Sequence, residues 1–142
     1  SYEKLNVYLS NLSVLNVNLH NIHWNVEGKR FMQVHEYTEE LYDYFFEKYD
    51  EIAEMLKMKG EKPLVKLSDY LENATIKELD KDNFTCLESY EIILDYLNEM
   101  KRLATEIRNE ADEANDFEVV AAFEDHVAEY SKNIWFAKAT LG

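Results

Sequence analysis

Residues that interrupt helices are almost absent from this chain. Among its 142 residues there are three glycines and one proline, and Gly28, Gly60 and Gly142 each stand where a helical pattern of apolar residues ends. Glycine and proline are the strongest breakers of regular structure, so their scarcity favours long, uninterrupted helices. The sequence therefore predicts an all-α protein.

Apolar residues recur at three- and four-residue spacing in four long segments, which is the pattern of amphipathic helices. The predicted long helices cover about residues 2–27, 33–59, 85–114 and 116 to the C-terminal end. Thr85 and Glu88 have the spacing of a capping box at the start of the third, and Asp116 is the expected N-cap of the fourth. A short helix, 64–73, is expected after Pro63.

These helices predict one domain, residues 1–142, folded as a four-helix bundle. The long connection between helices two and three holds the short extra helix and lets those two helices run parallel. The residues expected to face the core outside helix two are Leu5, Tyr8, Leu12, Leu15, Leu19, Ile22, Val26, Leu87, Tyr90, Leu94, Leu97, Ala104, Ile107, Val120, Phe123, Val127, Tyr130, Ile134 and Leu141.

The chain is strongly acidic, with 29 acidic and 15 basic residues and a net charge of −14. Such a surface repels nucleic-acid phosphate and attracts cations, so we do not expect DNA binding. We expect no membrane span, because no run of 18 apolar residues is present. The single cysteine, Cys86, fits a reducing compartment, and no signal peptide is visible, so a cytoplasmic protein is expected.

The second predicted helix carries two stripes of residues. The first should face the core and holds Leu41, Phe45, Tyr49, Ile52 and Leu56. The second lies roughly 110° away at 100° per residue. It holds His35, Glu39, Tyr42, Phe46, Asp50, Ala53 and Glu54. This second stripe is either the solvated edge of a wide core face or a second buried face used against a partner.

Four side chains of types that bind divalent metals lie on the first two helices: His23, His35, Asp50 and Glu54. Two imidazoles and two carboxylates suit a mid-sized metal such as iron. However, Asp50 follows His35 by 15 residues, which is about 22 Å along a straight helix. No single ion could contact both from one chain. Either these residues belong to different sites, or a second copy of the chain completes the site.

A two-fold pairing of chains would bring the four side chains together. His23 lies one turn before the end of helix one and His35 near the start of helix two, so a short turn places them close together. Asp50 and Glu54 are four residues apart and point the same way. If the second stripes of two chains pack antiparallel, His35 of one chain approaches Asp50 and Glu54 of the other, and each dimer holds two equivalent sites.

Other catalytic motifs are absent from the sequence. No Glu stands three residues before any of the four histidines, so the Glu-x-x-His ligands of many di-iron bundles are missing. The His-Glu-x-x-His zinc motif and a glycine-rich phosphate loop are missing as well. The four side chains above are therefore the leading candidates for chemistry.

The residues around these ligands resemble the signature of the Dps family of miniferritins. The matching residues are His23-Trp24-Asn25-Val26, Gly28, Phe31, His35 and Asp50-x-x-Ala53-Glu54. The connection over residues 63–74 and the segment Lys132-Asn133-Ile134-Trp135 also fit, so the resemblance spans nearly the whole chain. It implies an all-α, ferritin-like four-helix bundle with a short extra helix between helices two and three.

The resemblance also implies a function. Members of this family form dodecameric shells that oxidise Fe(II), preferably with hydrogen peroxide and otherwise with dioxygen, and that store Fe(III) mineral inside. Such a protein is a ferroxidase that protects against oxidative stress. Its substrates are Fe(II) and the oxidant, and its only expected partners are other copies of the same chain.

The ferroxidase centre of the family lies across a two-fold interface and holds two irons. By resemblance, His23 and His35 come from one subunit, and Asp50 and Glu54, with Glu54 as a bridging ligand, come from its partner. Glu39 falls where many members have an acid that holds a second, weaker iron through water. Beyond the metal ligands no catalytic residue is expected, although Trp24 would stand beside the centre as an electron donor.

The chain departs from the family pattern in places that do not touch these ligands. Met55 stands where many members have Arg, and Asn133 where many have His. The Lys-rich terminal tail that some members use to bind DNA is not present in this sequence. The alternative to a ferroxidase is a non-enzymatic protein on the same scaffold, such as an adhesin, an antigen or a zinc-binding shell.

Iron would need a path into a shell. Between residues 110 and 130 there are eight acidic residues and no Lys or Arg. An acidic pore would draw in cations, and the candidates to line it are Asp112, Glu113, Asp116, Glu118 and Asp125. Each of them is equally well explained as part of a solvated acidic surface.

Overall fold

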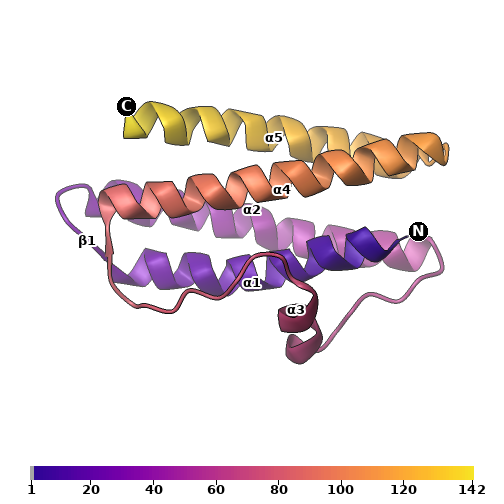
Figure 1. Cartoon of the computed structure of the whole chain (residues 1–142), viewed down its shortest axis with the longest axis horizontal. Coiled ribbons are helices and arrows are strands. Elements are labelled where there is room, and N and C mark those ends of the chain that lie inside the picture. Colours follow the sequence, from indigo (N-terminus) through magenta and orange to yellow (C-terminus); the bar gives the residue numbers. More distant parts are fainter. Residues whose placement is uncertain (1) are drawn as a thin grey trace. The chain divides into compact units, whose positions relative to one another are not determined.

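The computed structural model describes residues 2–142, which are mainly helical (Figure 1). The elements are α1 (Glu3–Asn25), β1 (Val26–Glu27), α2 (Phe31–Met58), α3 (Leu67–Asn73), β2 (Phe84–Thr85), α4 (Cys86–Glu113) and α5 (Phe117–Leu141). Two compact units are found, and the boundary between Tyr90 and Glu91 falls inside α4. No helix within residues 2–142 is long and apolar enough to cross a membrane.

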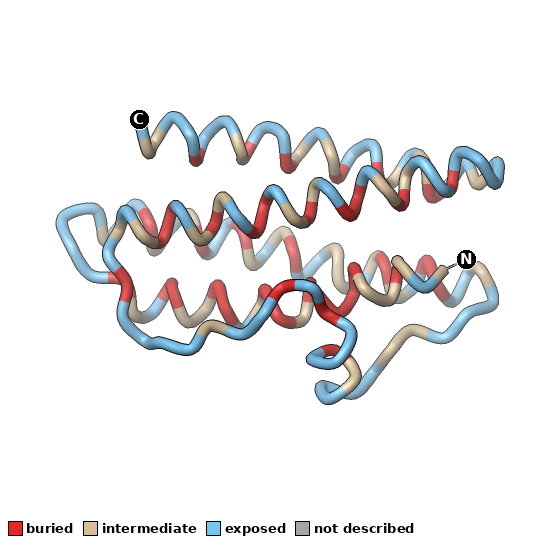
Figure 2. The backbone as a smooth tube through the Cα atoms, in the orientation of Figure 1, coloured by how far each residue is buried: buried red, intermediate tan, exposed pale blue. Residues whose placement is uncertain are grey.

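In the first unit, α1 and α2 pack against each other as an antiparallel hairpin (Figure 1). All seven predicted core residues on this part of the chain, from Leu5 to Val26, are buried, which confirms that stripe (Figure 2). On α2, four of the five predicted core residues are buried and Tyr49 is half-buried. The three- and four-residue apolar spacing therefore identified the packing faces correctly.

The end of α1 differs from the prediction. The helix was expected to reach residue 27, but it ends at Asn25, and the backbone then turns extended. Val26 and Glu27 pair in parallel with Phe84 and Thr85. Gly28 follows with a φ of 137°, a conformation that residues with a side chain rarely adopt. The pairing with a distant segment, which apolar spacing does not reveal, explains why the helix stops early.

The predicted start of the short helix is also wrong. Residues 64–66 are not helical, and α3 begins at Leu67. The backbone N–H of Leu64 donates to Asn6 Oδ1 at 2.9 Å, and its carbonyl accepts from the Tyr70 hydroxyl at 2.6 Å. Because side chains satisfy both backbone groups, Leu64 gains nothing from joining a helical turn.

Four asparagines on α1, the asparagine ladder, hold the connection between α2 and α4: Asn6, Asn11, Asn18 and Asn21. Their side-chain amides donate to Lys62 O, Thr75 Oγ1, Lys77 O and Lys81 O, respectively. Asn11 Oδ1 also accepts from the N–H groups of Thr75 and Ile76, at 2.8 and 3.1 Å. An amide offers both a donor and an acceptor, so it can satisfy an extended backbone much as a neighbouring strand would. The ladder thereby leads the chain along α1 to β2.

The start of α4 confirms the capping box. Glu88 N–H donates to Thr85 Oγ1 at 3.0 Å, and Thr85 N–H donates to Glu88 Oε1 at 3.3 Å. Leu87, expected in the core, is instead 60% exposed, so that prediction is wrong. Leu87 lies in the first turn of the helix, and the buried stripe of α4 begins two and three residues later, at Ser89 and Tyr90.

In the second unit, Asp116 caps α5 as predicted, because its side chain accepts from the N–H of Val119. Phe123 and Tyr130 are buried as expected, but Val120, Val127, Ile134 and Leu141 are only half-buried. The buried face also contains His126 and Asn133. Asn133 can be buried because its amide donates to the Glu129 carbonyl at 2.9 Å, which satisfies the polar group that the apolar pattern would exclude.

We predict that Asn11→Ala destabilises the protein far more than Asn21→Ala. Asn11 is fully buried, and its loss strands two backbone N–H groups, so the free energy of unfolding should fall by about 2–3 kcal/mol. Asn21 lies nearer the surface and makes one bond to the connection, so its loss should cost less than about 1 kcal/mol. Urea unfolding at equal protein concentrations measures both, and equal losses would contradict the role of the ladder.

Candidate metal centre

The structure brings His23 and His35 together at the turn between α1 and α2. Their rings are stacked with centroids 3.6 Å apart and planes 13° from parallel. His23 is 6% exposed, and His35 is half-buried. We call these two residues the histidine pair. The sequence expectation that a short turn would place them side by side is confirmed.

Reciprocal hydrogen bonds set the orientation of both rings. The Nδ1 of His23 lies 2.7 Å from the carbonyl oxygen of His35, and the Nδ1 of His35 lies 2.8 Å from the carbonyl oxygen of His23. A carbonyl oxygen can only accept, so each Nδ1 carries the proton that is donated. In the neutral rings, Nε2 therefore keeps its lone pair. A metal-binding histidine typically has this arrangement: one ring nitrogen binds the metal, and the other donates its hydrogen to a backbone carbonyl or a similar acceptor.

Thr38 is a further contributor, for which sequence patterns contain no signal. Its side chain is buried, and its Oγ1 lies 3.1 Å from His23 Nδ1. The hydroxyl hydrogen is directed to the carbonyl of Val34 at 2.8 Å or that of His35 at 3.0 Å, so Oγ1 accepts from His23. Thr38 therefore gives the same ring nitrogen a second acceptor.

Burial and charge favour the neutral form of His23. Burial lowers the pKa of His23 below its ordinary value of 6.5, and positive charge on His35 or His20 would lower it further. The hydrogen bond to the His35 carbonyl and the negative charge of Glu39 act in the opposite direction. The net effect is a lowered pKa, so His23 presents a free Nε2 to a cation at neutral pH.

Asp50 and Glu54, the carboxylate pair, lie one turn apart on α2 and are both exposed. A hydrogen bond between the two side chains, and then the charge of Asp50, raises the pKa of Glu54. Two neighbouring carboxylates repel each other when both are ionised, and they share a proton to relieve this repulsion. A divalent cation would relieve it in the same way, so the pair is suited to metal binding.

The two pairs are not brought together within one chain. Helix α2 is unbroken from Phe31 to Met58, so the rise from His35 to Asp50 is about 22 Å. Among residues 2–142, no group of three or more His, Cys, Asp or Glu side chains is placed to hold one metal ion. Each pair alone thus offers two ligands.

The other candidate residues lie around these pairs. Glu39 is exposed on α2, and Trp24 is 68% exposed at the end of α1, with its ring 5.4 Å from that of His20. The Nδ1 of His20 lies 2.6 Å from the carbonyl of Asn16. The ring of Phe31 stacks with that of His35, with centroids 5.0 Å apart.

Asp112 and Asp116, which were predicted to line a pore, have local roles in the second unit. Asp112 lies 3.6 Å from Arg108, and Asp116 caps α5. Glu113, Glu118 and Asp125 are exposed. The local structure thus explains Asp112 and Asp116 without a pore.

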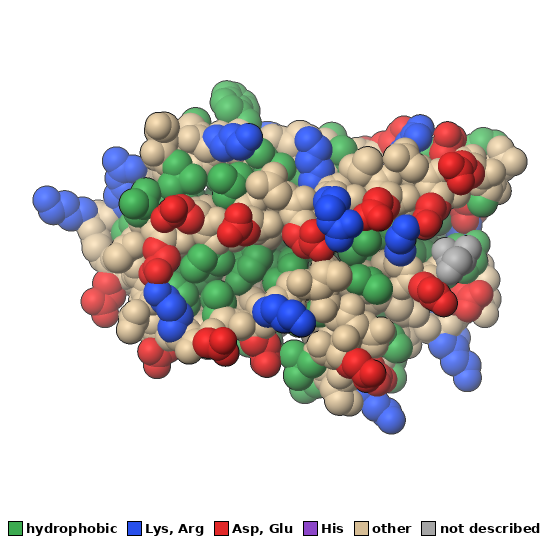
Figure 3. All heavy atoms as spheres, viewed as in Figure 1, with side chains coloured by type: hydrophobic (Ala, Val, Ile, Leu, Met, Phe, Trp, Pro, Cys, Tyr) green, Lys and Arg blue, Asp and Glu red, His purple; other side chains and the backbone are tan. Residues whose placement is uncertain are grey.

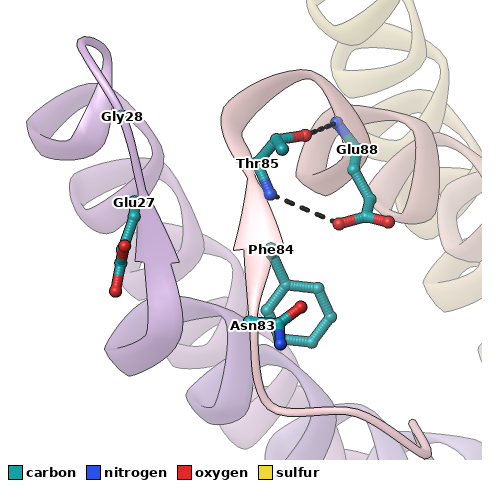
Figure 4. A pocket seen from close by; sticks show the side chains of 6 residues that line it. All are labelled: Glu27, Gly28, Asn83, Phe84, Thr85 and Glu88. Carbon is teal, nitrogen blue, oxygen red and sulfur yellow. Dashed lines mark hydrogen bonds between the residues drawn. The ribbon is translucent and has the colours of Figure 1, made fainter.

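A surface pocket of about 420 Å³ lies where β1, β2 and the start of α4 meet (Figure 4). It is lined by Glu27, Gly28, Asn83, Phe84, Thr85 and Glu88. The Thr85 and Glu88 side chains in it are engaged in the capping box, and Glu88 also pairs with Lys81. None of the four predicted ligands lines this pocket.

Comparisons with known proteins define the class of the fold. A family model described as a ferritin-like domain matches residues 2–142. The crystal structure of CAIP from Helicobacter cinaedi superposes with a TM-score of 0.97 at 36% identity, covering 99% of this chain and 98% of that one. The predicted all-α, ferritin-like bundle is thereby confirmed.

Named relatives identify the family within this fold class. The DNA protection during starvation protein of Helicobacter pylori is 33% identical over 141 residues, which cover 99% of this chain and 98% of that protein. A Dps structure from Vibrio cholerae, described as a member of a broad superfamily of ferritin-like diiron-carboxylate proteins, has a TM-score of 0.94 at 31% identity and covers 98% of this chain and 87% of its own. The chain belongs to the Dps family of ferritin-like proteins.

We predict that stability without metal depends on pH through His23. The folded protein disfavours the charged ring, so as the pH falls below about 6.5 the unfolded chain takes up the proton first. The free energy of unfolding should therefore fall between about pH 7.5 and about pH 5.5, and less steeply in His23→Gln. Urea unfolding in a chelating buffer measures this, and identical pH slopes would contradict it.

Proposed function

We propose that this protein oxidises Fe(II) at a two-iron centre shared by two subunits and stores the Fe(III) product inside a shell. His23 and His35 of one subunit would bind iron together with Asp50 and Glu54 of its partner. The observation that carries the proposal is the histidine pair itself, with both Nδ1 atoms bonded to backbone carbonyls and both Nε2 atoms free. The carboxylate pair lies about 22 Å away on the same helix, too far to complete that site within one chain.

Exposed aromatic side chains on α1 and α2 support a two-fold contact. Phe46 on the second stripe of α2 is 67% exposed, and Trp24 on α1 is similarly exposed. Large exposed apolar side chains rimmed by polar ones are typical of interaction surfaces. An antiparallel contact of two such faces would place the histidine pair of each chain against the carboxylate pair of the other, at both ends of the interface. This favours the partner-facing reading of the stripe over a solvated edge.

The chemistry follows from the side chains. Neutral imidazoles and carboxylates both bind Fe(II), and the anionic oxygens stabilise the Fe(III) product. Two Fe(II) ions give one electron each to hydrogen peroxide, which takes up two protons and leaves as two water molecules. Because hydrogen peroxide receives both electrons at one centre, no hydroxyl radical is released. The family relationship to diiron-carboxylate proteins supports iron as the metal.

The shell is proposed to be a dodecamer formed by a single ferritin-like domain, residues 1–142. The match of one family model to nearly the whole chain supports the single domain. Glu39 would hold a second, weaker iron, and Trp24 would stand beside the centre as an electron donor. Some of the exposed acids near the turn between α4 and α5 would guide iron inward. The single cysteine supports a cytoplasmic location.

Removal of iron and peroxide, not coverage of DNA, is the proposed route of protection. The Helicobacter pylori relative is named for DNA protection during starvation, but a net charge of −14 on this chain opposes binding to phosphate. On the face shown in Figure 3, Lys and Arg side chains are dispersed among Asp and Glu. Retardation of plasmid DNA by the protein at physiological salt would contradict this part of the proposal.

The activity predicts a rapid rise in Fe(III) absorbance when Fe(II) and hydrogen peroxide are added to the assembled protein. Glu54→Gln should slow the rise by about tenfold or more, because it removes one anionic ligand. Glu47→Gln is the matched control, since Glu47 is an exposed acid on the same helix outside the proposed ligand set. A wild-type rate no greater than that of buffer would favour the alternative, a non-enzymatic interaction or metal-binding protein on this scaffold.

The shared site predicts complementation between inactive variants. Asp50→Ala and His35→Ala should each be inactive alone. In randomly co-assembled shells, however, about a quarter of the centres would combine an intact histidine pair with an intact carboxylate pair, and the rate should recover to about that fraction. Co-assembly of His23→Ala with His35→Ala is the control and should recover nothing. Native mass spectrometry of the mixtures would show whether twelve copies of the 16.9 kDa chain assemble.

A further inference from the structure

Tyr42 contacts two histidines on successive turns of α1. The face of its ring stacks on His20, with centroids 3.8 Å apart and planes 17° from parallel. Its ring stands nearly perpendicular to that of His23, at 85° with a centroid distance of 5.3 Å. Tyr42 is half-buried and lies one turn beyond Thr38 on α2. One side chain of α2 therefore fits between two imidazoles of α1.

His20 is itself held in place. Its Nδ1 donates to the carbonyl of Asn16 on the preceding turn, at 2.6 Å. The ring is therefore tied to the backbone of α1, and it offers Tyr42 a flat surface whose orientation is set by that bond. His20 and Tyr42 together, which we call the His20–Tyr42 stack, join the two helices beside the histidine pair.

The His23 ring is then constrained on several sides. The ring of His35 stacks on the ring of His23 with centroids 3.6 Å apart. The His35 carbonyl and Thr38 Oγ1 accept hydrogen bonds from His23 Nδ1. The ring of Tyr42 lies nearly perpendicular to that of His23. Hydrogen bonds at Nδ1 alone still allow the ring to tilt about the bonded atom. A perpendicular aromatic neighbour limits that tilt, because aromatic rings pack with preferred edge and face geometry.

We propose that Tyr42, supported by His20, is a positioning residue that sets the direction of the His23 Nε2 lone pair toward the shared metal site. This inference rests on the proposed function, in which His23 is a ligand. His20 acts only through Tyr42 and does not bind the metal. The ring of Tyr42, and not its hydroxyl, carries the effect, since both contacts involve the ring.

Co(II) is a suitable probe, because its visible absorption bands report the number and geometry of its nitrogen and oxygen ligands. It is titrated into the assembled full chain. Tyr42→Leu removes the ring and should weaken Co(II) binding by about tenfold, the usual scale for loss of a group that orients a metal ligand, and should alter the bands. Tyr42→Phe keeps the ring and should leave affinity and bands unchanged. Tyr44→Leu, at a half-buried tyrosine of α2 that lies outside the second stripe, is the matched control and should also leave them unchanged.

His20 supplies independent variants. His20→Phe keeps a flat ring for Tyr42 and should bind Co(II) nearly as the wild type does, whereas His20→Ala should resemble Tyr42→Leu. If His20→Phe loses binding as fully as His23→Ala, then His20 is a ligand and the positioning role is wrong. Circular dichroism and native mass spectrometry check that each variant folds and assembles. If Tyr42→Leu fails to assemble, Co(II) binding by His20→Ala decides the question.

The remaining outcomes separate this inference from the proposed function. Unchanged Co(II) affinity and bands in Tyr42→Leu, with binding lost in His23→Ala, would overturn the positioning role alone. Equal weakening in Tyr42→Phe or Tyr44→Leu would overturn it too, because the loss would then not follow the ring that contacts His23. Wild-type binding in His23→Ala would overturn the ligand assignment, and the positioning role with it.

Discussion

Two hydrogen bonds at the turn between α1 and α2 organise the end of the hairpin where two of the four candidate ligands lie. In each, an imidazole Nδ1 of one helix donates to the backbone carbonyl of the other histidine, at 2.7 and 2.8 Å. They close the helical hairpin at the end where α1 gives way to β1. They also settle the tautomer of both neutral rings, so that two Nε2 lone pairs remain available. A turn that served only to connect two helices would not need this exchange. Here the same bonds hold the turn and orient the two rings for the proposed metal site.

The length of α2 is the second constraint. An unbroken helix keeps the neutral histidine pair and the anionic carboxylate pair about 22 Å apart. Their properties are opposite: burial suppresses the positive charge of His23, whereas Asp50 and Glu54 stand exposed and repel each other. Each pair alone offers two ligands, one set neutral nitrogens and the other anionic oxygens. The proposed two-fold contact is the simplest arrangement that would join them, and it would account for ligand-type side chains that share a stripe with exposed aromatic residues such as Phe46.

The asparagine ladder shows how a long connection can be held without regular structure. Asn11 and Asn18 are buried, yet their amides are satisfied by backbone groups of residues 75–79 and by the Thr75 hydroxyl. Buried polar side chains of this kind define one path for the chain, because any other path would leave them unpaired. They also explain why α3 begins later than predicted, since Asn6 Oδ1 accepts a hydrogen bond from the N–H of Leu64. Apolar spacing identifies which face of α1 is buried, but it does not say which polar residues on that face will bind another segment.

The sequence by itself determined the helices, the core of α1 and α2, the two helix caps and the family. These depend on local patterns: apolar spacing, Thr85 with Glu88, Asp116, and the motif around His23 and His35. It also identified the four candidate ligands and showed that one chain could not unite them, because the rise per residue of a helix is constant. Only the tertiary structure decided where α1 ends, where α3 begins and that Leu87 is exposed. It also decided that Thr38 and Tyr42, with His20 behind Tyr42, lie around the His23 ring. Those outcomes depend on contacts between residues distant in the chain, whose geometry has no periodic signature in the sequence.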